Sequence, residues 1–302
     1  MIATRTVTTR DGVRLAVRDY GSSGVSHTVV LLHGFCLDQS SWDIQIDELI
    51  RQWGNDIRII SYDHRGHGNS CGAPMRTYRI EQLADDLATV LVSLGVTGPL
   101  TLAGHSMGGM TALAYLARGA GDRPVEPQSL LPIASAAGRL AERGLGRLLA
   151  APAVHILYAL VQRLPFALTD ETVRVLTRPV CTALTRYGGY AAGWEALAAV
   201  SAGTVNATKL TTKVGFLPSL RDYDQYRTLG SISATTTVVT GGADKLTPPT
   251  HARDLFARIP GASLLHCPAA GHMLLHKAAR LVTDAISSAI TRYGAASIPV
   301  TP

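Results

Sequence analysis

Short runs of apolar residues alternate with longer amphipathic segments along the first 135 residues of the chain. The runs at 28–32, 57–62 and 129–133 are continuous and of strand length, which is typical of strands buried on both faces of a parallel sheet. Between the second and third runs, residues 80–94 repeat their apolar side chains at helical spacing. This alternation of strands and helices predicts an α/β fold with a mostly parallel sheet.

Further segments of the same two kinds complete the predicted core. The other predicted strands are at 4–8, 14–20, 100–103, 236–240 and 263–266. The other predicted helices are at 42–53, 108–118, 251–259 and 276–291. The first two strands flank Asp11-Gly12, a dipeptide typical of hairpin turns, so we expect them to pair with each other.

The alternation breaks near Gly138 and resumes after residue 229. The segment between these points is helical in pattern and is interrupted by Gly144, Gly146, Pro152, Pro165, Pro179, Gly188-Gly189 and Pro218. It is too long for a bare loop. We therefore predict one catalytic domain whose core is formed by residues 1–137 and 230–302, with residues 138–229 inserted as a helical cap.

Composition and charge exclude several classes of protein. Of the 302 residues, 46% are hydrophobic and 17% are charged, which excludes a mostly disordered chain and a charge-rich coiled coil. The net charge is +6, from 28 basic and 22 acidic residues, but the basic residues are scattered. We therefore expect no nucleic-acid partner. The four cysteines stand far apart, without zinc-type spacing, so no metal is expected.

The sequence carries two signals about location. The first twelve residues, MIATRTVTTRDG, lack the apolar segment of a signal peptide, and a cytoplasmic protein is expected. The uncharged stretch at 148–161 is shorter than the roughly 20 residues that cross a bilayer. It either lines an acyl tunnel, lies on a lipid surface as a peripheral membrane contact, or packs against the core. The oligomeric state is left open.

Residues 104–108 read GHSMG and match the pattern G-x-S-x-G. They stand between a predicted strand and a predicted helix, where a nucleophile elbow places its serine. Gly104 and Gly108 flank a sharp turn in which a side chain would meet neighbouring backbone. Ser106 is therefore the candidate nucleophile, and the following helix supplies a positive N-terminus for a developing oxyanion.

A serine hydroxyl needs a base to take its proton, and the base needs an orienting carboxylate. His272 follows the predicted strand 263–266, and Asp244 follows the predicted strand 236–240. Because open parallel sheets place their sites at the carboxyl ends of the strands, we expect a triad of Ser106, Asp244 and His272. The loop after the strand 28–32 reads HGF, so the amides of Phe35 and Met107 are the predicted oxyanion donors.

These motifs, together with YDHRGHGNS at 62–70, resemble in their order the landmarks of serine hydrolases of the α/β-hydrolase superfamily over residues 5–292. The resemblance implies an eight-stranded, mostly parallel sheet flanked by helices, with the insert as a cap over the active site. It also implies esterase- or lipase-like activity. The residues expected to support the elbow and the oxyanion loop are His33, Gly34, Gly104, His105 and Gly108.

Departures from related subfamilies narrow the expected reaction. Ser106 stands where epoxide hydrolases and haloalkane dehalogenases have an aspartate nucleophile, so their chemistry is not expected. The HGF loop differs from the HGGG of one lipase group and from the HGW frequent in perhydrolases. The GPG that follows this loop in carbon–carbon bond hydrolases is absent, because Phe35 is followed by CLDQSSW.

The predicted function is hydrolysis of carboxylic esters through an acyl-enzyme, without a cofactor. Aromatic residues of the cap region predict a lipophilic small-molecule substrate, and they are Tyr158, Phe166, Tyr187, Tyr190, Trp194 and Phe216. Three other enzyme classes share the triad and stay open: thioesterases, cofactor-free perhydrolases or haloperoxidases, and carbon–carbon bond hydrolases. A small-molecule receptor on the same fold is the alternative that is not an enzyme.

Several residues near the motifs have rival interpretations. His276 is an alternative base, and Asp222 and Asp224 are alternative acids. Asp63 and Arg65 are interpreted as supports of a turn, and His105 as a packing or hydrogen-bonding residue of the elbow. His64, His67 and His105 lack the helical spacing of a metal site. Cys36 and Cys267 are expected to be unreactive thiols near the site.

Overall fold

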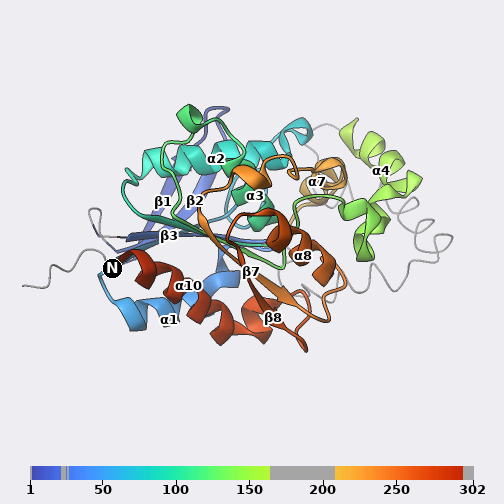
Figure 1. Ribbon diagram of the computed structural model, residues 1–302. Helices are drawn as coiled ribbons and strands as arrows, with labels where there is room; N and C mark the ends of the chain where they lie inside the picture. Colours follow the sequence, from blue (N-terminus) through green and yellow to red (C-terminus); the bar gives the residue numbers. More distant parts are fainter. Residues whose placement is uncertain (1, 22–24, 26, 164–207, 295–302) are drawn as a thin grey trace, which may run out of the picture.

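The computed structural model describes residues 2–21, 25, 27–163 and 208–294 (Figure 1). Within these residues, eight strands form one sheet in the order β1-β2-β4-β3-β5-β6-β7-β8. The strands are β1 (Ile2–Thr8), β2 (Arg14–Tyr20), β3 (His27–Leu32), β4 (Ile57–Tyr62), β5 (Leu100–His105), β6 (Ser129–Ile133), β7 (Thr235–Gly241) and β8 (Ser263–Cys267). β1 and β2 form an antiparallel hairpin, β2 is antiparallel to β4, and the other pairs are parallel. The predicted α/β fold with a mostly parallel eight-stranded sheet is confirmed.

The register of the parallel strands brings their carboxyl ends to one edge of the sheet. Leu32 at the end of β3 lies opposite Gly104 of β5, and Gly241 at the end of β7 lies opposite Cys267 of β8. The loops that follow these four strands carry the predicted site residues. They therefore begin at the same edge of the sheet.

Helices cover both faces of this sheet (Figure 1). One face is covered by α1 (Asp43–Trp53), α9 (Leu274–Lys277) and α10 (Ala279–Gly294), and the other by α2 (Ile80–Ser93), α3 (Met107–Leu116) and α8 (Pro249–Arg258). Side chains of β3 alternate between the two layers, because successive residues of a strand point to opposite faces. Val29 and Leu31 belong to the core of the first layer, and Val30 and Leu32 to that of the second.

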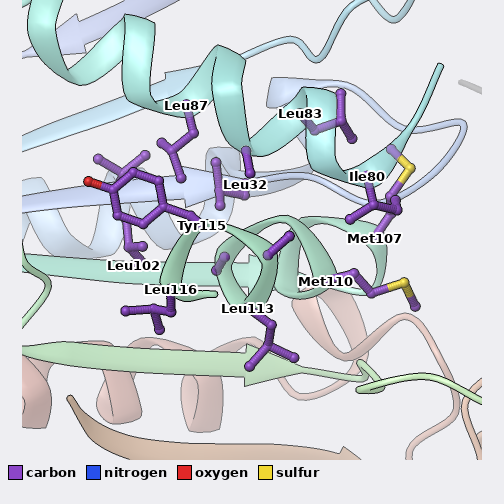
Figure 2. Packing of buried hydrophobic residues seen from close by; sticks show 14 of the residues in the cluster. Leu32, Ile80, Leu83, Leu87, Leu102, Met107, Met110, Leu113, Tyr115 and Leu116 are labelled. Atoms are coloured by element: carbon purple, nitrogen blue, oxygen red, sulfur yellow. The ribbon is translucent and has the colours of Figure 1, made fainter. Parts of the chain in front are cut away.

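Figure 2 shows the packing between α2, α3 and the sheet. Leu83 and Leu87 of α2 point toward α3 and the strands, where they meet Leu32 and Tyr115. All four side chains are fully buried. This packing holds α3, and with it the turn that precedes α3, firmly against the sheet.

The described part of the predicted cap consists of helical segments at one end of the sheet (Figure 1). These are η4 (Leu140–Glu142), η5 (Gly144–Ala150), α4 (Pro152–Gln162), α7 (Leu210–Asp222) and η6 (Leu229–Ser231). The two ends of the insert meet, because Gln225 N–H donates to the Ala137 carbonyl at 2.7 Å and Gly138 pairs with Asp224. Phe166, Tyr187, Tyr190 and Trp194 lie outside the described residues, and the cap boundaries stay a prediction.

The apolar stretch 148–161 is divided between η5 and α4. Leu157 and Val161 of α4 pack against Val214 of α7. Among the described helices, no single one has the length and apolar character that a membrane crossing requires, whereas the bent pair Gly144–Ala150 and Val154–Gln162 meets those criteria together.

Two helix predictions are wrong. Pro218 was expected to break the chain but lies inside α7, where the buried side chains of Phe216, Leu217 and Leu220 anchor the helix on both sides of the proline. Packing here outweighs the lost backbone hydrogen bond. The single helix expected at 276–291 is two helices, because Ala278 has the non-helical angles φ −133° and ψ 39°. The remaining short helices are η1 (Gln39–Trp42), η2 (Met75–Thr77) and η3 (Ala120–Asp122).

Candidate active site

Ser106 occupies the turn between β5 and α3. Its backbone has φ 53° and ψ −116°, a conformation that L-residues rarely adopt. The turn is fixed at the nucleophile itself, because Ser106 N–H donates to the Ile133 carbonyl of β6 at 2.8 Å. The side chain is half-buried, and it stands at the N-terminus of α3. This backbone conformation is what the nucleophile elbow predicted from the GHSMG motif requires, and the nucleophilic role of Ser106 stays a prediction.

The two glycines of the elbow are required by close backbone approaches. A Cβ atom on Gly104 would lie 2.4 Å from backbone atoms of Gly108 and Gly109. A Cβ atom on Gly108 would lie 2.1 Å from the carbonyl oxygen of Leu32, at the end of β3. Neither position has space for a side chain, so the glycines allow α3 to begin directly above the sheet.

His272 and Asp244, the predicted base and acid, are hydrogen-bonded to each other. His272 Nδ1 lies 2.8 Å from Asp244 Oδ2, and both side chains are largely shielded from solvent. Nδ1 carries the proton that it donates to the carboxylate, which leaves Nε2 of the neutral ring as an acceptor. The ring is therefore in the tautomer that a general base requires.

Four hydrogen bonds fix the Asp244 carboxylate. Oδ1 accepts the N–H groups of Leu246 and Thr247 at 2.8 and 2.9 Å, and Oδ2 accepts from Thr247 Oγ1 and His272 Nδ1, each at 2.8 Å. Burial alone would raise the pKa of Asp244, but His272 and the donors of Thr247 outweigh it and hold that pKa below its ordinary value. Asp244 is therefore a fixed, ionised carboxylate, as the predicted orienting group would have to be.

His105 connects the elbow to the loop that carries the base. Its Nε2 lies 2.9 Å from the carbonyl oxygen of His272, so this nitrogen donates. The two rings are 5.0 Å apart between centroids. Burial lowers the pKa of His105 to about 3, and the ring is neutral. The residue that precedes Ser106 therefore holds the main chain of His272 beside the nucleophile, as the hydrogen-bonding interpretation of His105 expects.

The HGF loop lies against Ser106. A Cβ atom on Gly34 would lie 3.3 Å from Cβ of Ser106 and 2.8 Å from Nδ1 of His105. In the described part of the chain, neither Phe35 N–H nor Met107 N–H has a backbone acceptor. Both amides are thus available beside the serine, as an oxyanion hole requires.

His33 supports the HGF loop through two hydrogen bonds of its ring. Its Nε2 accepts the N–H of His64 at 2.9 Å, so the proton is on Nδ1, which donates to the Gly34 carbonyl at 2.8 Å. Burial lowers the pKa of His33 and keeps the ring neutral. The predicted supporting role of His33 is consistent with these two contacts.

A model described as the alpha/beta hydrolase family matches residues 29–285. The chain belongs to the alpha/beta hydrolase family. The matched residues include Phe35, Ser106, Asp244 and His272, so the match covers the whole candidate site.

Individual hydrolases with similar sequences or structures extend this comparison. The protein YisY of Bacillus subtilis, described as an AB hydrolase superfamily protein, is 27% identical over 88% of this chain and 91% of its own. The bifunctional esterase/perhydrolase DCH of Acinetobacter calcoaceticus is 34% identical over 37% of this chain, and the match spans 38% of its own length. The esterase EaEST of Exiguobacterium antarcticum has the same fold, with a TM-score of 0.71, 22% identity, and coverage of 96% of this chain and 100% of its own.

The residues considered as alternatives to His272 and Asp244 in this hydrolase have different surroundings. His276 is exposed on α9. Asp222 pairs with Arg221 on the surface, and Asp224 accepts the N–H of Tyr226. Of the three candidate acids, Asp244 is the one that contacts His272.

The DHRGHG loop is a buried support of the site. Asp63 accepts the N–H groups of Gln39 and Asn69, each at 2.8 Å. Arg65 is fully buried and donates twice to Asp86 at 2.7 Å and also to Asp11. These contacts tie the loop to α2 and to the first hairpin, consistent with a structural role for both residues.

The described histidines and cysteines give no metal site. No group of three or more His, Cys, Asp or Glu side chains within residues 2–21, 25, 27–163 and 208–294 is arranged to hold a metal ion. Burial lowers the pKa of His67 to about 3, and raises that of Cys36 to about 12, so the first is a neutral ring and the second a thiol.

Two residues that contact the site were missed at the level of sequence. Ser135 Oγ donates to the Ser106 carbonyl at 2.8 Å, and Thr247 contacts the Asp244 carboxylate. Thr247 stands three residues after an aspartate, a spacing typical of local hydrogen bonds between an Asp side chain and the following backbone. Ser135 carries no comparable local signal, because its contact joins two distant segments.

Proposed function

We propose that this hydrolase cleaves carboxylic esters through an acyl-enzyme formed on Ser106. The observation that carries the proposal is the position of the strained Ser106 turn beside the His272–Asp244 pair, to which it is joined by the hydrogen bond from His105 to the His272 carbonyl. A nucleophile, a base in the correct tautomer and an ionised orienting group are what acyl transfer requires.

In the first half of the reaction, Ser106 Oγ attacks the ester carbonyl while His272 Nε2 takes its proton. Asp244 stabilises the imidazolium that forms, and the amides of Phe35 and Met107 bind the oxyanion. The intermediate collapses when the imidazolium gives its proton to the leaving alcohol. The carbonyl–alkoxy bond breaks, and the acyl group stays on Ser106.

In the second half of the reaction, a water molecule is the nucleophile in place of Ser106 Oγ. His272 takes a proton from the water molecule as it attacks the acyl carbonyl, and the same two amides bind the second oxyanion. Collapse releases the carboxylic acid and returns the proton to Ser106. Every proton moves through one ring nitrogen, so the neutral form of His272 is required at the start of each half.

The substrate that we propose has a lipophilic acyl group. Phe35 of the oxyanion loop and Phe216 of α7 make an edge contact, with ring centroids 6.1 Å apart. Leu157, Val161 and Val214 form an apolar cluster between α4 and α7. These side chains would form an apolar wall that runs from the oxyanion loop toward the described cap helices α4 and α7.

The test is a series of p-nitrophenyl esters from acetate to palmitate, assayed with the wild type and with Ser106→Ala. We expect turnover by the wild type, a preference for acyl chains longer than acetate, and loss of turnover in the variant. Equal rates for the two proteins would contradict the proposal, as would inactivity of the wild type on every ester.

Matched assays separate ester hydrolysis from the reactions that share the triad. Thioesters of the same acyl groups test thioesterase activity, and adding hydrogen peroxide as the acyl acceptor tests perhydrolysis. A β-diketone substrate tests carbon–carbon bond cleavage. Thermal stabilisation by a ligand without product release would instead support the receptor alternative.

A further inference from the structure

The hydroxyl of Thr247 lies where the acid, the base and the end of β6 meet. Its Oγ1 is 2.8 Å from Asp244 Oδ2, 2.8 Å from the carbonyl oxygen of Ala134 and 3.3 Å from His272 Nδ1. Thr247 is 4% exposed, so bulk water does not compete for these contacts. The proposed mechanism does not use this group.

The hydroxyl has one proton and two oxygen acceptors at equal distances. A carboxylate is the stronger acceptor, so the proton is directed toward Asp244 Oδ2. Oδ2 then receives two donors, Thr247 Oγ1 and His272 Nδ1. The negative charge that faces the imidazole is therefore shared with the hydroxyl.

The other neighbour of the hydroxyl gives it a fixed position. Ala134 follows β6 with φ 47°, and its N–H donates to the Val239 carbonyl of β7 at 2.8 Å. The Ala134 carbonyl, which lies next to Thr247, is thus part of the sheet frame. Thr247 connects this frame to the loop that carries the acid.

We propose that Thr247 is a positioning residue of the Asp244–His272 pair, an inference that rests on the proposed hydrolase function. Its hydroxyl holds Oδ2 in line with Nδ1, and by sharing the carboxylate charge it weakens the hold of the acid on the extra proton of the imidazolium. Ester hydrolysis by the enzyme therefore extends to lower pH than it would without this hydroxyl.

The test compares two substitutions at the same position. Thr247→Val keeps the shape of the side chain and removes the hydroxyl, whereas Thr247→Ser keeps the hydroxyl and removes the methyl group. We expect kcat of the valine variant to fall about tenfold with little change in KM. We also expect the acidic limb of its kcat/KM profile to move to higher pH. The serine variant keeps the wild-type profile and a rate within about twofold.

Two results would overturn the inference. In the first, the valine variant has the rate and pH profile of the wild type. In the second, both variants lose activity in proportion to their loss of thermal stability, with the acidic limb unmoved, which would make Thr247 a packing residue only. Titration with a fluorophosphonate counts the folded, reactive sites in each preparation, so a misfolded fraction is not mistaken for a lower kcat.

The same experiment separates this inference from the proposed function. Ser106→Ala is assayed beside the two variants on the same ester. If that variant retains activity, the acyl-enzyme proposal fails. If it is inactive while Thr247→Val matches the wild type, the proposed function stands and the role of Thr247 is wrong.

Discussion

At the scale of single residues, Asp244 differs from the alternative acids because both of its carboxylate oxygens accept two hydrogen bonds. Two backbone amides occupy Oδ1, and a hydroxyl and an imidazole occupy Oδ2. Asp222, by contrast, has an exposed ion pair with Arg221. A carboxylate held from all sides can fix the tautomer of a histidine, whereas a surface ion pair contributes little to either structure or catalysis.

This difference predicts opposite results for the same substitution at the two positions. Asp244→Asn places an amide NH₂ opposite His272 Nδ1 and forces the ring proton to Nε2, where it blocks proton transfer from Ser106. We expect kcat to fall by about 10⁴-fold, the effect seen for such a change in other triads. Asp222→Asn leaves kcat unchanged. Steady-state ester hydrolysis measures both, and a strong loss in Asp222→Asn instead would assign the acid to α7.

At the scale of elements, the active site depends on the contact between the start of α3 and the end of β3. Gly108 is the residue at this contact, and its missing side chain sets the distance between the helix and Leu32. Because the Met107 amide precedes it directly, any displacement of α3 moves a predicted oxyanion donor.

Gly108→Ala would therefore damage both catalysis and stability. The new Cβ would lie 2.1 Å from the Leu32 carbonyl, and backbone must move to admit it. We expect kcat/KM to fall about 100-fold and the unfolding free energy to fall by about 2–4 kcal/mol. Gly121→Ala is the matched control, because a Cβ there meets nothing within 4 Å. Urea unfolding measures the unfolding free energy of both variants, and ester assays measure their kcat/KM. Equal losses in the two variants would contradict the close contact between Gly108 and Leu32.

The elements show which parts of the structure a sequence can predict. Ile57–Tyr62 and Ser129–Ile133 are predicted to the residue, because a continuous apolar run has one favourable place in a parallel sheet. The prediction that Pro218 interrupts a helix fails because the residues around it are buried against other elements, and the sequence does not show that burial. Ala278 gives no local signal for the break between α9 and α10.

In the candidate site, too, some features can be predicted from the sequence and others cannot. Gly104, Ser106 and Gly108 follow from a local motif, because the turn they form is local. The pairing of Asp244 with His272 follows from their places after neighbouring strands. The contact from Thr247 to Ala134 and that from Ser135 to Ser106 join segments that only the finished fold brings together, so no sequence pattern contains them.

At the scale of the whole molecule, buried neutral histidines link stability to pH. Burial lowers the pKa from 6.5 to about 4 in His27 and His251 and to about 3 in His67 and His105. Between pH 6.5 and these lowered pKa values, the histidine rings bind protons in the unfolded chain but stay neutral in the folded protein. Their contribution to stability is therefore complete above pH 6.5 and is lost progressively as the pH falls.

We expect the unfolding free energy to fall between about pH 6.5 and about pH 4, by about 1.4 kcal/mol per pH unit for each such histidine. Removing one of them, in His251→Leu, makes the decline less steep. Val92 is exposed and does not titrate, so Val92→Ala leaves the slope unchanged. Denaturant unfolding at several pH values measures both slopes. A stability that is the same at about pH 7 and about pH 5 would show that these rings are not held neutral.

The central claim is that Ser106 carries the acyl group, and the intact mass of the protein during turnover tests it most directly. The wild type is mixed with a p-nitrophenyl ester, quenched in acid and analysed by mass spectrometry, with peptide mapping to locate any adduct. The account predicts a mass increase of one acyl group on Ser106 and none in Ser106→Ala. Rapid hydrolysis with no adduct at any quench time, or an adduct on another residue, would contradict it.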